Sequence, residues 1–222
     1  MTAVGVSTAP AYTVYPPMTG NVACNYDGTS SFRPPLGFSP GHGDDNINPT
    51  VDSKWKVVGT LSACSGTQTG GNPRHPGPVA TGDVLIKGKA VDHACQKVTD
   101  FGLSVSRVRI RWYEADGGHL LVSKGIGTAT VEGLGDGWPY IGFGPMTEPG
   151  FVPPGIITVH LTAVLDAASR SFPGKTVTMT AVSDQTLEDT YLPCSFTYPP
   201  VTVGMAGWDF HGAQGASSLS VG

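Results

Sequence analysis

The chain has 222 residues, of which 31 are Gly and 19 are Pro, and this content of turn-forming residues excludes a helical protein. The hydrophobic content of 39%, with 4 Trp, 7 Tyr and 8 Phe, is too high for a disordered Gly/Pro polymer, so a folded domain is expected. The formal net charge of −4 argues against nucleic acid as a partner, because phosphate binding needs a cationic surface, but it leaves room for a local basic patch.

Residues 1–21 predict an extended N-terminal arm. Residues 11–15 alternate weakly between polar and apolar types until Pro16 and Pro17 interrupt the pattern. Residues 1–15 lack the basic start and the apolar run of a signal peptide, so we expect either a removed leader or another exit route. A phage virion protein, which is released by lysis, would need no leader. No stretch approaches the roughly 20 apolar residues of a membrane span, and none is expected.

Three strands are predicted in the first half of the chain. The first begins at Val22, and a polar loop follows it. Residues 54–63 alternate, because Trp55, Val57, Gly59, Leu61 and Ala63 share one face and Lys54, Lys56, Val58, Thr60 and Ser62 share the other. Residues 79–91 repeat the scheme, with Val84 and Ile86 opposite a face that carries Asp83, Leu85, Lys87 and Lys89.

The clearest alternation lies at residues 105–113. Ser106, Val108, Ile110 and Trp112 are expected on one face, and Val105, Arg107, Arg109, Arg111 and Tyr113 on the other. The pattern predicts a strand with one apolar and one cationic face. Asp116-Gly117-Gly118 then suits a tight hairpin, with residues 119–123 as the returning strand. Residues 125–154 are so rich in Gly and Pro that we expect a long loop with short strand pieces.

The second half repeats the alternating pattern. Residues 156–166 place Ile157, Val159, Leu161, Ala163 and Leu165 on one face, and residues 176–182 and 191–203 offer further strands. About seven to nine strands separated by turn signals predict an all-β fold, an antiparallel β-sandwich of immunoglobulin-like or jelly-roll-like type.

The domain division follows from these patterns. The sandwich is assigned to residues 22–205, between the arm at 1–21 and a Gly/Ser-rich tail at 206–222. Trp208 and Phe210 are the large apolar residues of this tail, and we expect it to dock through them.

The four cysteines are Cys24, Cys64, Cys95 and Cys194. They stand singly, without a CxxC pair and without His at metal-ligand spacing, so zinc fits poorly. An even number of cysteines at wide spacing suits two disulfides in oxidising surroundings. Three pairings are open, and we favour Cys24–Cys64 with Cys95–Cys194. The alternative is four buried free thiols in a β core.

Several short motifs resemble those of a known group of proteins. They are Cys24-Asn25-Tyr26-Asp27-Gly28, Phe32, Pro34-Pro35-Leu36, the segment from Val58 to Cys64, Cys95, and Ile110-Arg111-Trp112. Together they are similar to small β-rich proteins predicted to be secreted by actinobacteria, over roughly residues 22–200. The resemblance implies an exported, disulfide-bonded β fold and no particular chemistry. The chain departs from the group by insertions near residues 40–50 and 133–155 and by having no leader, and a leaderless relative could be a phage structural protein.

The arginine row is the first candidate binding site. Arg107, Arg109 and Arg111 would stand on one face of a strand at intervals of about 7 Å and could grip sulfate, phosphate or an acidic glycan. The favoured alternative is cross-strand pairing with Asp or Glu of neighbouring strands.

Aromatic side chains form the second candidate. Trp138, Tyr140 and Phe143 lie among glycines and could stack on a sugar, and Trp208 and Phe210 could contact a partner. The favoured alternative is that these rings plug the end of the domain or a subunit contact.

Other chemistry has weaker support. Asp44 and Asp45 lie in an oxygen-rich loop that could hold a hard cation, but a solvated loop is favoured and no metal or cofactor is expected. No Gly-x-Ser-x-Gly elbow or phosphate-binding Gly loop is present, so no catalytic residue is assigned.

We therefore expect a non-enzymatic structural protein, exposed on a virion or another surface assembly, such as a capsid decoration or tail component of an actinobacterial phage. Its partners would be copies of itself or other structural subunits, contacted through the arm and the tail. The alternative is a secreted β-sandwich module that binds a cell-wall glycan or a host surface. Both place the protein in a virion or outside the cell.

Overall fold

The computed structural model describes residues 16–36, 51–70, 77–93, 103–115, 118–132, 157–183, 207–211 and 217–222. Within these ranges every regular element is a β-strand, so the all-β prediction is confirmed. In chain order the strands are β1 (Thr19–Gly20), β2 (Val22–Arg33), β3 (Val51–Ser65), β4 (Gln68–Thr69), β5 (Thr81–His93), β6 (Leu103–Tyr113), β7 (His119–Glu132), β8 (Thr158–Leu165), β9 (Thr176–Val182), β10 (Asp209–Phe210) and β11 (Ser218–Val221). None of the described residues belongs to a helix long and apolar enough to cross a membrane.

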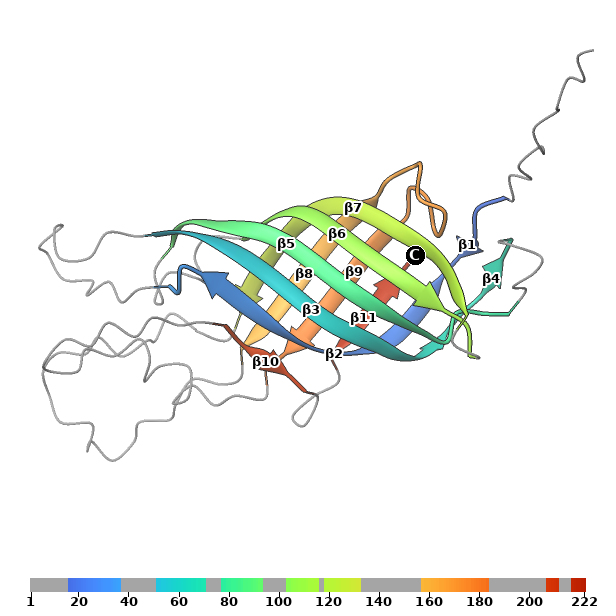
Figure 1. Ribbon diagram of the computed structural model, residues 1–222, viewed down its shortest axis with the longest axis horizontal. Helices are drawn as coiled ribbons and strands as arrows, with labels where there is room; N and C mark the ends of the chain where they lie inside the picture. Colours follow the sequence, from blue (N-terminus) through green and yellow to red (C-terminus); the bar gives the residue numbers. More distant parts are fainter. Residues whose placement is uncertain are drawn as a thin grey trace, which may run out of the picture.

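The predicted β-sandwich, immunoglobulin-like or jelly-roll-like, is wrong, because the main sheet closes into an 8-strand antiparallel barrel. The strands follow one another as β2, β3, β5, β6, β7, β8, β9 and β11, and β11 then pairs with β2. Figure 1 shows β2, β3, β5 and β6 along one side of the barrel and β8, β9 and β11 across from them. Among the described residues, closure gives every strand of the main sheet a neighbour on both sides except the short β10.

Closure depends on a pairing that joins the two ends of the chain. β11 pairs with β2 from Ser218↔Asn25 to Val221↔Val22, and it pairs with β9 on its other side. Further along the same edge of β2, β10 takes over with Asp209↔Thr29 and Phe210↔Gly28. The segment 206–222 therefore contributes wall strands to the barrel.

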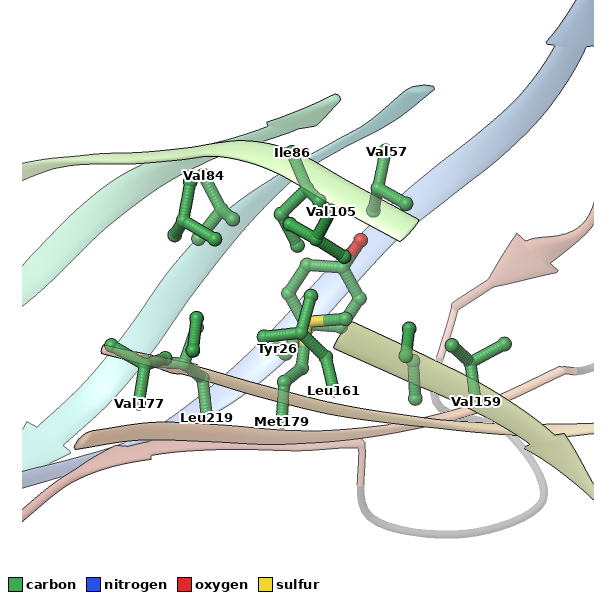
Figure 2. Packing of buried hydrophobic residues seen from close by; sticks show 14 of the residues in the cluster. Tyr26, Val57, Val84, Ile86, Val105, Val159, Leu161, Val177, Met179 and Leu219 are labelled. Atoms are coloured by element: carbon green, nitrogen blue, oxygen red, sulfur yellow. The ribbon is translucent and has the colours of Figure 1, made fainter. Parts of the chain in front are cut away.

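The interior of the barrel is filled by apolar side chains. Residues from opposite walls point toward one another, as Figure 2 shows for Tyr26, Ile86, Leu161 and Met179. All five expected inward residues of β8 and its approach, from Ile157 to Leu165, are buried. An eight-stranded barrel is just wide enough for side chains to fill its interior, so the core takes the place of a central cavity.

Aromatic side chains close both ends of the barrel. At one end Trp112 packs edge-on against Phe172, with ring centroids 5.4 Å apart, and its Nε1 donates to Ser123 Oγ at 2.9 Å. At the other end Phe32 packs edge-on against Trp208, with ring centroids 5.2 Å apart.

The seam between β2 and β3 carries a disulfide, as predicted. Cys24 and Cys64 are bonded, with their Cα atoms 4.1 Å apart. The register between the two strands shifts beside this bond, where Ala63 has a φ of 49°. Cys95 and Cys194, the other predicted pair, lie outside the described residues.

The prediction for β6 needs one correction. Val105 is buried and Ser106 exposed, the reverse of the expected faces. The register with β5 shifts between Lys87 and Gly88, where Lys87 pairs with Arg107 and Gly88 with Val105, so Ser106 is an extra residue in the strand. Such a β-bulge reverses the alternation beyond it, and residue types alone do not reveal it.

The prediction for β7 also needs a correction. The strand continues to Glu132, whereas residues 125–154 were expected to form a loop with short strand pieces. Gly125 and Gly127 looked like breakers but lie where the backbone of β8 approaches closely, and a Cβ at Gly127 would overlap the carbonyl oxygen of Thr162. Glycine in a strand can mark such an approach.

The described end of the predicted arm pairs within its own chain. Thr19 and Gly20 form β1 with β4, and the buried Met18 bridges to Ser171. Met18 donates its N–H to the carbonyl oxygen of Arg170 and accepts from the N–H of Phe172.

Candidate functional site

The outward side chains of β2, β3, β5 and β6 form the most strongly charged surface of the described residues. We call it the cationic wall. The chain has 13 Lys and Arg, and eight of them stand at outward positions on these four strands. They are Arg33, Lys54, Lys56, Lys87, Lys89, Arg107, Arg109 and Arg111. Because successive side chains in a strand point to opposite faces, the filled interior leaves these residues outside.

The register of the strands gathers the cations into rows. Lys54 pairs with Lys89, and Lys56 pairs with Lys87, which pairs in turn with Arg107. Directly opposite residues lie about 5 Å apart, and like charges at that distance repel one another. The sequence therefore places mutually repelling cations side by side, an arrangement that packing does not require.

The three predicted arginines have different neighbours. Arg107 faces Lys87, and Arg109 lies between Leu85 on β5 and Lys124 on β7. Arg111 has Asp83 as its register partner on β5. Two of the three arginines thus have no carboxylate directly opposite on β5.

A shallow groove of about 650 Å³ runs across the cationic wall. Val58 and Leu85 form an apolar floor, and Lys56 and Lys87 stand on one bank. Arg109 lies at the β6 end, where its Nε is buried without a hydrogen-bond acceptor in the described part of the chain. Its guanidinium is therefore held against the wall beside the groove.

The other bank of the groove carries two carboxylates, and Arg111 on β6 continues the same row as the register partner of Asp83. Asp27 and Asp83 are separated by Thr60 in one row across β2, β3 and β5. Asp83 Oδ2 accepts a hydrogen bond of 2.6 Å from the hydroxyl of Tyr113, and Asp27 Oδ1 lies 3.1 Å from His211 Nδ1. Both carboxylates are fixed in place by neighbours.

Two tyrosines near this bank have altered acidity. The hydrogen bond to Asp83 is the main cause that raises the pKa of the Tyr113 phenol, because losing the proton would break the bond and leave two negative charges together. Burial is the main cause that raises the pKa of Tyr26, and the charge of Asp27 adds to it.

The opposite side of the barrel has a different surface. β8, β9 and β11 contain no Lys, Arg, Asp or Glu. Their outward positions are mainly Thr and Ser, and we call this surface the threonine wall. The members are Thr158, His160, Thr162, Val164, Thr176, Thr178, Thr180, Val182, Ser218 and Ser220.

Trp208 and Phe210, two other predicted site residues, are buried in the core and are not part of the groove lining. Trp208 and Phe210 are 1% and 0% exposed, and Phe210 packs against Tyr26 with ring centroids 6.3 Å apart. Trp138, Tyr140 and Phe143 lie outside the described residues, as do Asp44 and Asp45. In the described ranges no group of three or more His, Cys, Asp or Glu could hold a metal ion.

Sequence reasoning found the arginine row but missed the lysines that join it. The signal was present, since Lys54, Lys56, Lys87 and Lys89 were all expected to face away from the apolar side of their strands. Their proximity follows only when β3, β5 and β6 are known to be neighbours in this register.

In comparisons with known proteins, no family model, no curated protein and no solved structure matches the chain. The resemblance to secreted actinobacterial proteins remains a prediction.

Proposed function

We propose that this chain is a non-enzymatic binding protein, exposed on a virion or outside the cell, whose cationic wall attaches it to an anionic surface polymer. The observation that carries the proposal is the concentration of cations on one wall of a chain with a net charge of −4. An anionic polymer that lies across the rows would neutralise several like charges at once. Its release of counterions would drive the attachment.

Binding on the outside of the barrel agrees with the state of the interior. Barrels that hold small molecules use an internal cavity, but here buried side chains such as Trp55, Ile110 and Met179 fill that space. A partner would therefore meet the outward faces of the strands.

The location outside the cell rests on the disulfide. The Cys24–Cys64 bond is compatible with an oxidising location, as found for secreted and virion-surface proteins. The resemblance to secreted actinobacterial proteins supports a bacterial cell surface as the setting, for a secreted module or a phage component alike.

Immobilised dextran sulfate tests the proposal, with neutral dextran as the reference surface. The protein should bind the sulfated polymer only, and the affinity should fall steeply with salt. Replacing two groove lysines, Lys56→Glu with Lys87→Glu, should weaken binding on the order of 10- to 100-fold at low salt.

The matched control is Arg170→Glu with Lys175→Glu. These exposed residues lie between β8 and β9, and the change in net charge is the same. Affinity should fall no more than about 3-fold, since distant exposed charges are screened. No binding by the natural chain, or equal losses in both variants, would contradict the proposal.

A structural role in an assembly is the second candidate, and one observation favours it. Ile126 and Val164 are register partners on β7 and β8 and are 64% and 54% exposed. Contiguous exposed apolar surface marks contacts between subunits, and this pair lies side by side across two strands. Light scattering coupled to size-exclusion chromatography should then show an oligomer that Ile126→Asp with Val164→Asp converts to a monomer, and a monomeric natural chain would contradict this role.

A further inference from the structure

The groove on the cationic wall combines an apolar floor, a cationic bank and an acidic bank. A surface that served only to attract negative charge would gain nothing from carboxylates at the edge of its groove. Asp27 and Asp83 nevertheless line it, and each faces the same apolar strip formed by Val58 and Leu85. Arg111 stands opposite Asp83 at the end of the acidic bank, so the two banks offer a ligand different groups, cations alone on one side and carboxylates with a single arginine on the other.

We infer that the ligand is an acidic polysaccharide, an inference that rests on the proposed function. Lys56, Lys87 and Arg109 hold its carboxylate or sulfate groups. Asp27 and Asp83 accept hydrogen bonds from its hydroxyl groups, and the C–H faces of the sugar rings lie on Val58 and Leu85.

The spacing of the groove suits this arrangement. Outward residues two positions apart on a strand are about 7 Å apart, so the row with Lys56 and Lys87 lies about 14 Å from the row with Asp27 and Asp83. The row with Val58 and Leu85 lies midway. A sugar ring placed on this middle row would have its substituents directed to both banks.

The carboxylates are suited to accept hydroxyl hydrogens. An ionised carboxylate has about four lone-pair sites and no donor, and its hydrogen bonds are stronger than those between neutral groups. Tyr113 uses one of the two oxygens of Asp83, and His211 contacts one oxygen of Asp27. The contacts hold the carboxylates in position and leave acceptor capacity on each.

The same carboxylates disfavour a polymer that carries only negative charge. Polyphosphate has no hydroxyl groups along its chain, so its phosphates would meet Asp27 and Asp83 as like charges, which outnumber the single cation Arg111 in this row of the groove lining. Like charges brought together across an interface weaken it and reject wrong partners. The acidic bank thus selects hydroxyl-bearing polyanions over phosphate chains.

Two polyanions test this by calorimetry at one ionic strength, polygalacturonate with one charge per sugar ring and long-chain polyphosphate with one charge per phosphate. Polyphosphate carries more charge per unit length, so a site that recognised charge alone would prefer it. The natural chain should bind polygalacturonate at least about 5-fold more tightly than polyphosphate. The reason is that hydrogen bonds from hydroxyl groups to charged carboxylates are stronger than hydrogen bonds between neutral groups. In the variant Asp27→Asn with Asp83→Asn the affinity for polygalacturonate should fall and the affinity for polyphosphate should rise.

The matched control is Asp52→Asn with Asp166→Asn, which changes the net charge equally at exposed positions away from the groove lining. It should move both affinities slightly upward. Opposite shifts in the groove variant and parallel shifts in the control support the inference. If the natural chain binds neither probe, the proposed function fails; if it binds both but the groove variant shifts them in the same direction, the proposed function stands and the polysaccharide inference is overturned.

Discussion

The cationic wall and the threonine wall enclose the same core, yet their outer surfaces differ completely. Inward residues on both walls are apolar and buried, as with Ile110 on β6 and Leu161 on β8. Eight outward residues on one side are Lys or Arg, and Asp27 and Asp83 stand beside them, whereas those on the other side are uncharged at neutral pH and mainly Thr and Ser. The fold therefore constrains the inward positions equally and leaves the outward ones open. Charge that accumulates on one wall against its own repulsion points to a partner rather than to folding.

The largest expected effects come from the shared interior. Trp112→Ala, on the cationic wall, should lower the free energy of unfolding by about 3–5 kcal/mol, because it removes the contact with Phe172 and leaves a cavity. Leu161→Ala, on the threonine wall, should cost about 2–5 kcal/mol for the same reason. Denaturant unfolding measures the two free energies. Circular dichroism can follow both variants, and tryptophan fluorescence can also follow Leu161→Ala, which keeps Trp112.

The matched surface changes are Arg111→Ala and Thr162→Ala, one on each wall. Each should stay within about 1 kcal/mol of the natural chain, since exposed positions contribute little and an exposed charge pair such as Arg111 with its register partner Asp83 is worth at most about 1 kcal/mol. If Trp112→Ala or Leu161→Ala left the free energy of unfolding unchanged, the wall that carries that residue would not share the core.

The next effect comes from the disulfide, which joins two neighbouring strands of the cationic wall. Cys24→Ala with Cys64→Ala should cost about 2–4 kcal/mol, because the bond closes a loop with a sequence separation of 40 and restricts the unfolded chain. The measurement is the denaturation midpoint of the double variant. Adding a reductant to this variant tests for disulfides elsewhere, since any further loss must come from other cysteines. An unchanged midpoint in the variant would contradict a stabilising bond.

Exchanging surface residues between the walls should change the free energy of unfolding by a smaller amount. The change should be positive for one exchange and negative for the other. Lys56→Thr with Lys87→Thr relieves repulsion between opposite residues and should stabilise the protein by about 0.5–1 kcal/mol at low salt. Thr162→Lys with Thr178→Lys places the same pair on β8 and β9, where these residues are register partners, and should destabilise it by a similar amount.

Salt separates this electrostatic effect from packing. Both shifts should shrink toward zero in about 1 M salt, where the screening length is about 3 Å. Equal stabilities of the two variants at low salt would mean that the cationic wall carries no internal repulsion.

For much of the cationic wall and the threonine wall, the sequence predicts which residues point inward and which point outward, because this depends on local alternation. The inward residues of residues 157–165 and the outward lysines of β3 and β5 follow from period-two patterns, and the structure confirms these faces. The hairpin between β6 and β7 follows from its turn residues, and Glu114 N–H indeed donates to the carbonyl oxygen of Gly118.

The barrel itself could not be predicted in this way. Its closure depends on Ser218–Val221, a strand whose alternation of Ser with Leu and Val spans only four residues and follows a Gly/Ser-rich segment, so it is too short to indicate a strand by itself. The strand is fixed by Leu219 and Val221 entering the core and by pairing with β2 and β9. Consecutive antiparallel strands are equally compatible with a sandwich, so only this long-range contact separates the two folds.

The candidate site was predictable in part for the same reason. Arg107, Arg109 and Arg111 lie on one strand and could be recognised from spacing. The acidic bank joins Asp27 to Asp83 across an intervening strand, and nothing in the separation of these residues along the chain indicates that they line one groove.

The smallest expected effect concerns the tyrosines of the cationic wall at alkaline pH. Tyr26 and Tyr113 have raised pKa values in the folded protein, whereas in the unfolded chain both should ionise near the ordinary value of 10.0. The unfolded state therefore loses protons first, so stability is complete below pH about 10 and falls as the pH rises further. Because the Tyr113 side chain is partly exposed, screening by solvent keeps its share of this loss small.

The pKa of Tyr113 is raised mainly by a hydrogen bond and that of Tyr26 mainly by burial. Near-ultraviolet absorbance of the phenolate can separate these two causes. Asp83→Asn removes the charged acceptor, so the pKa of Tyr113 should move back toward 10.0 while that of Tyr26, raised mainly by burial, stays high. Asp166→Asn should change neither. If Asp83→Asn left the Tyr113 titration unchanged, the hydrogen bond would not hold in solution, and the fixed position of Asp83 on the acidic bank would lose its support. The alkaline titration therefore tests the geometry of the groove without any ligand.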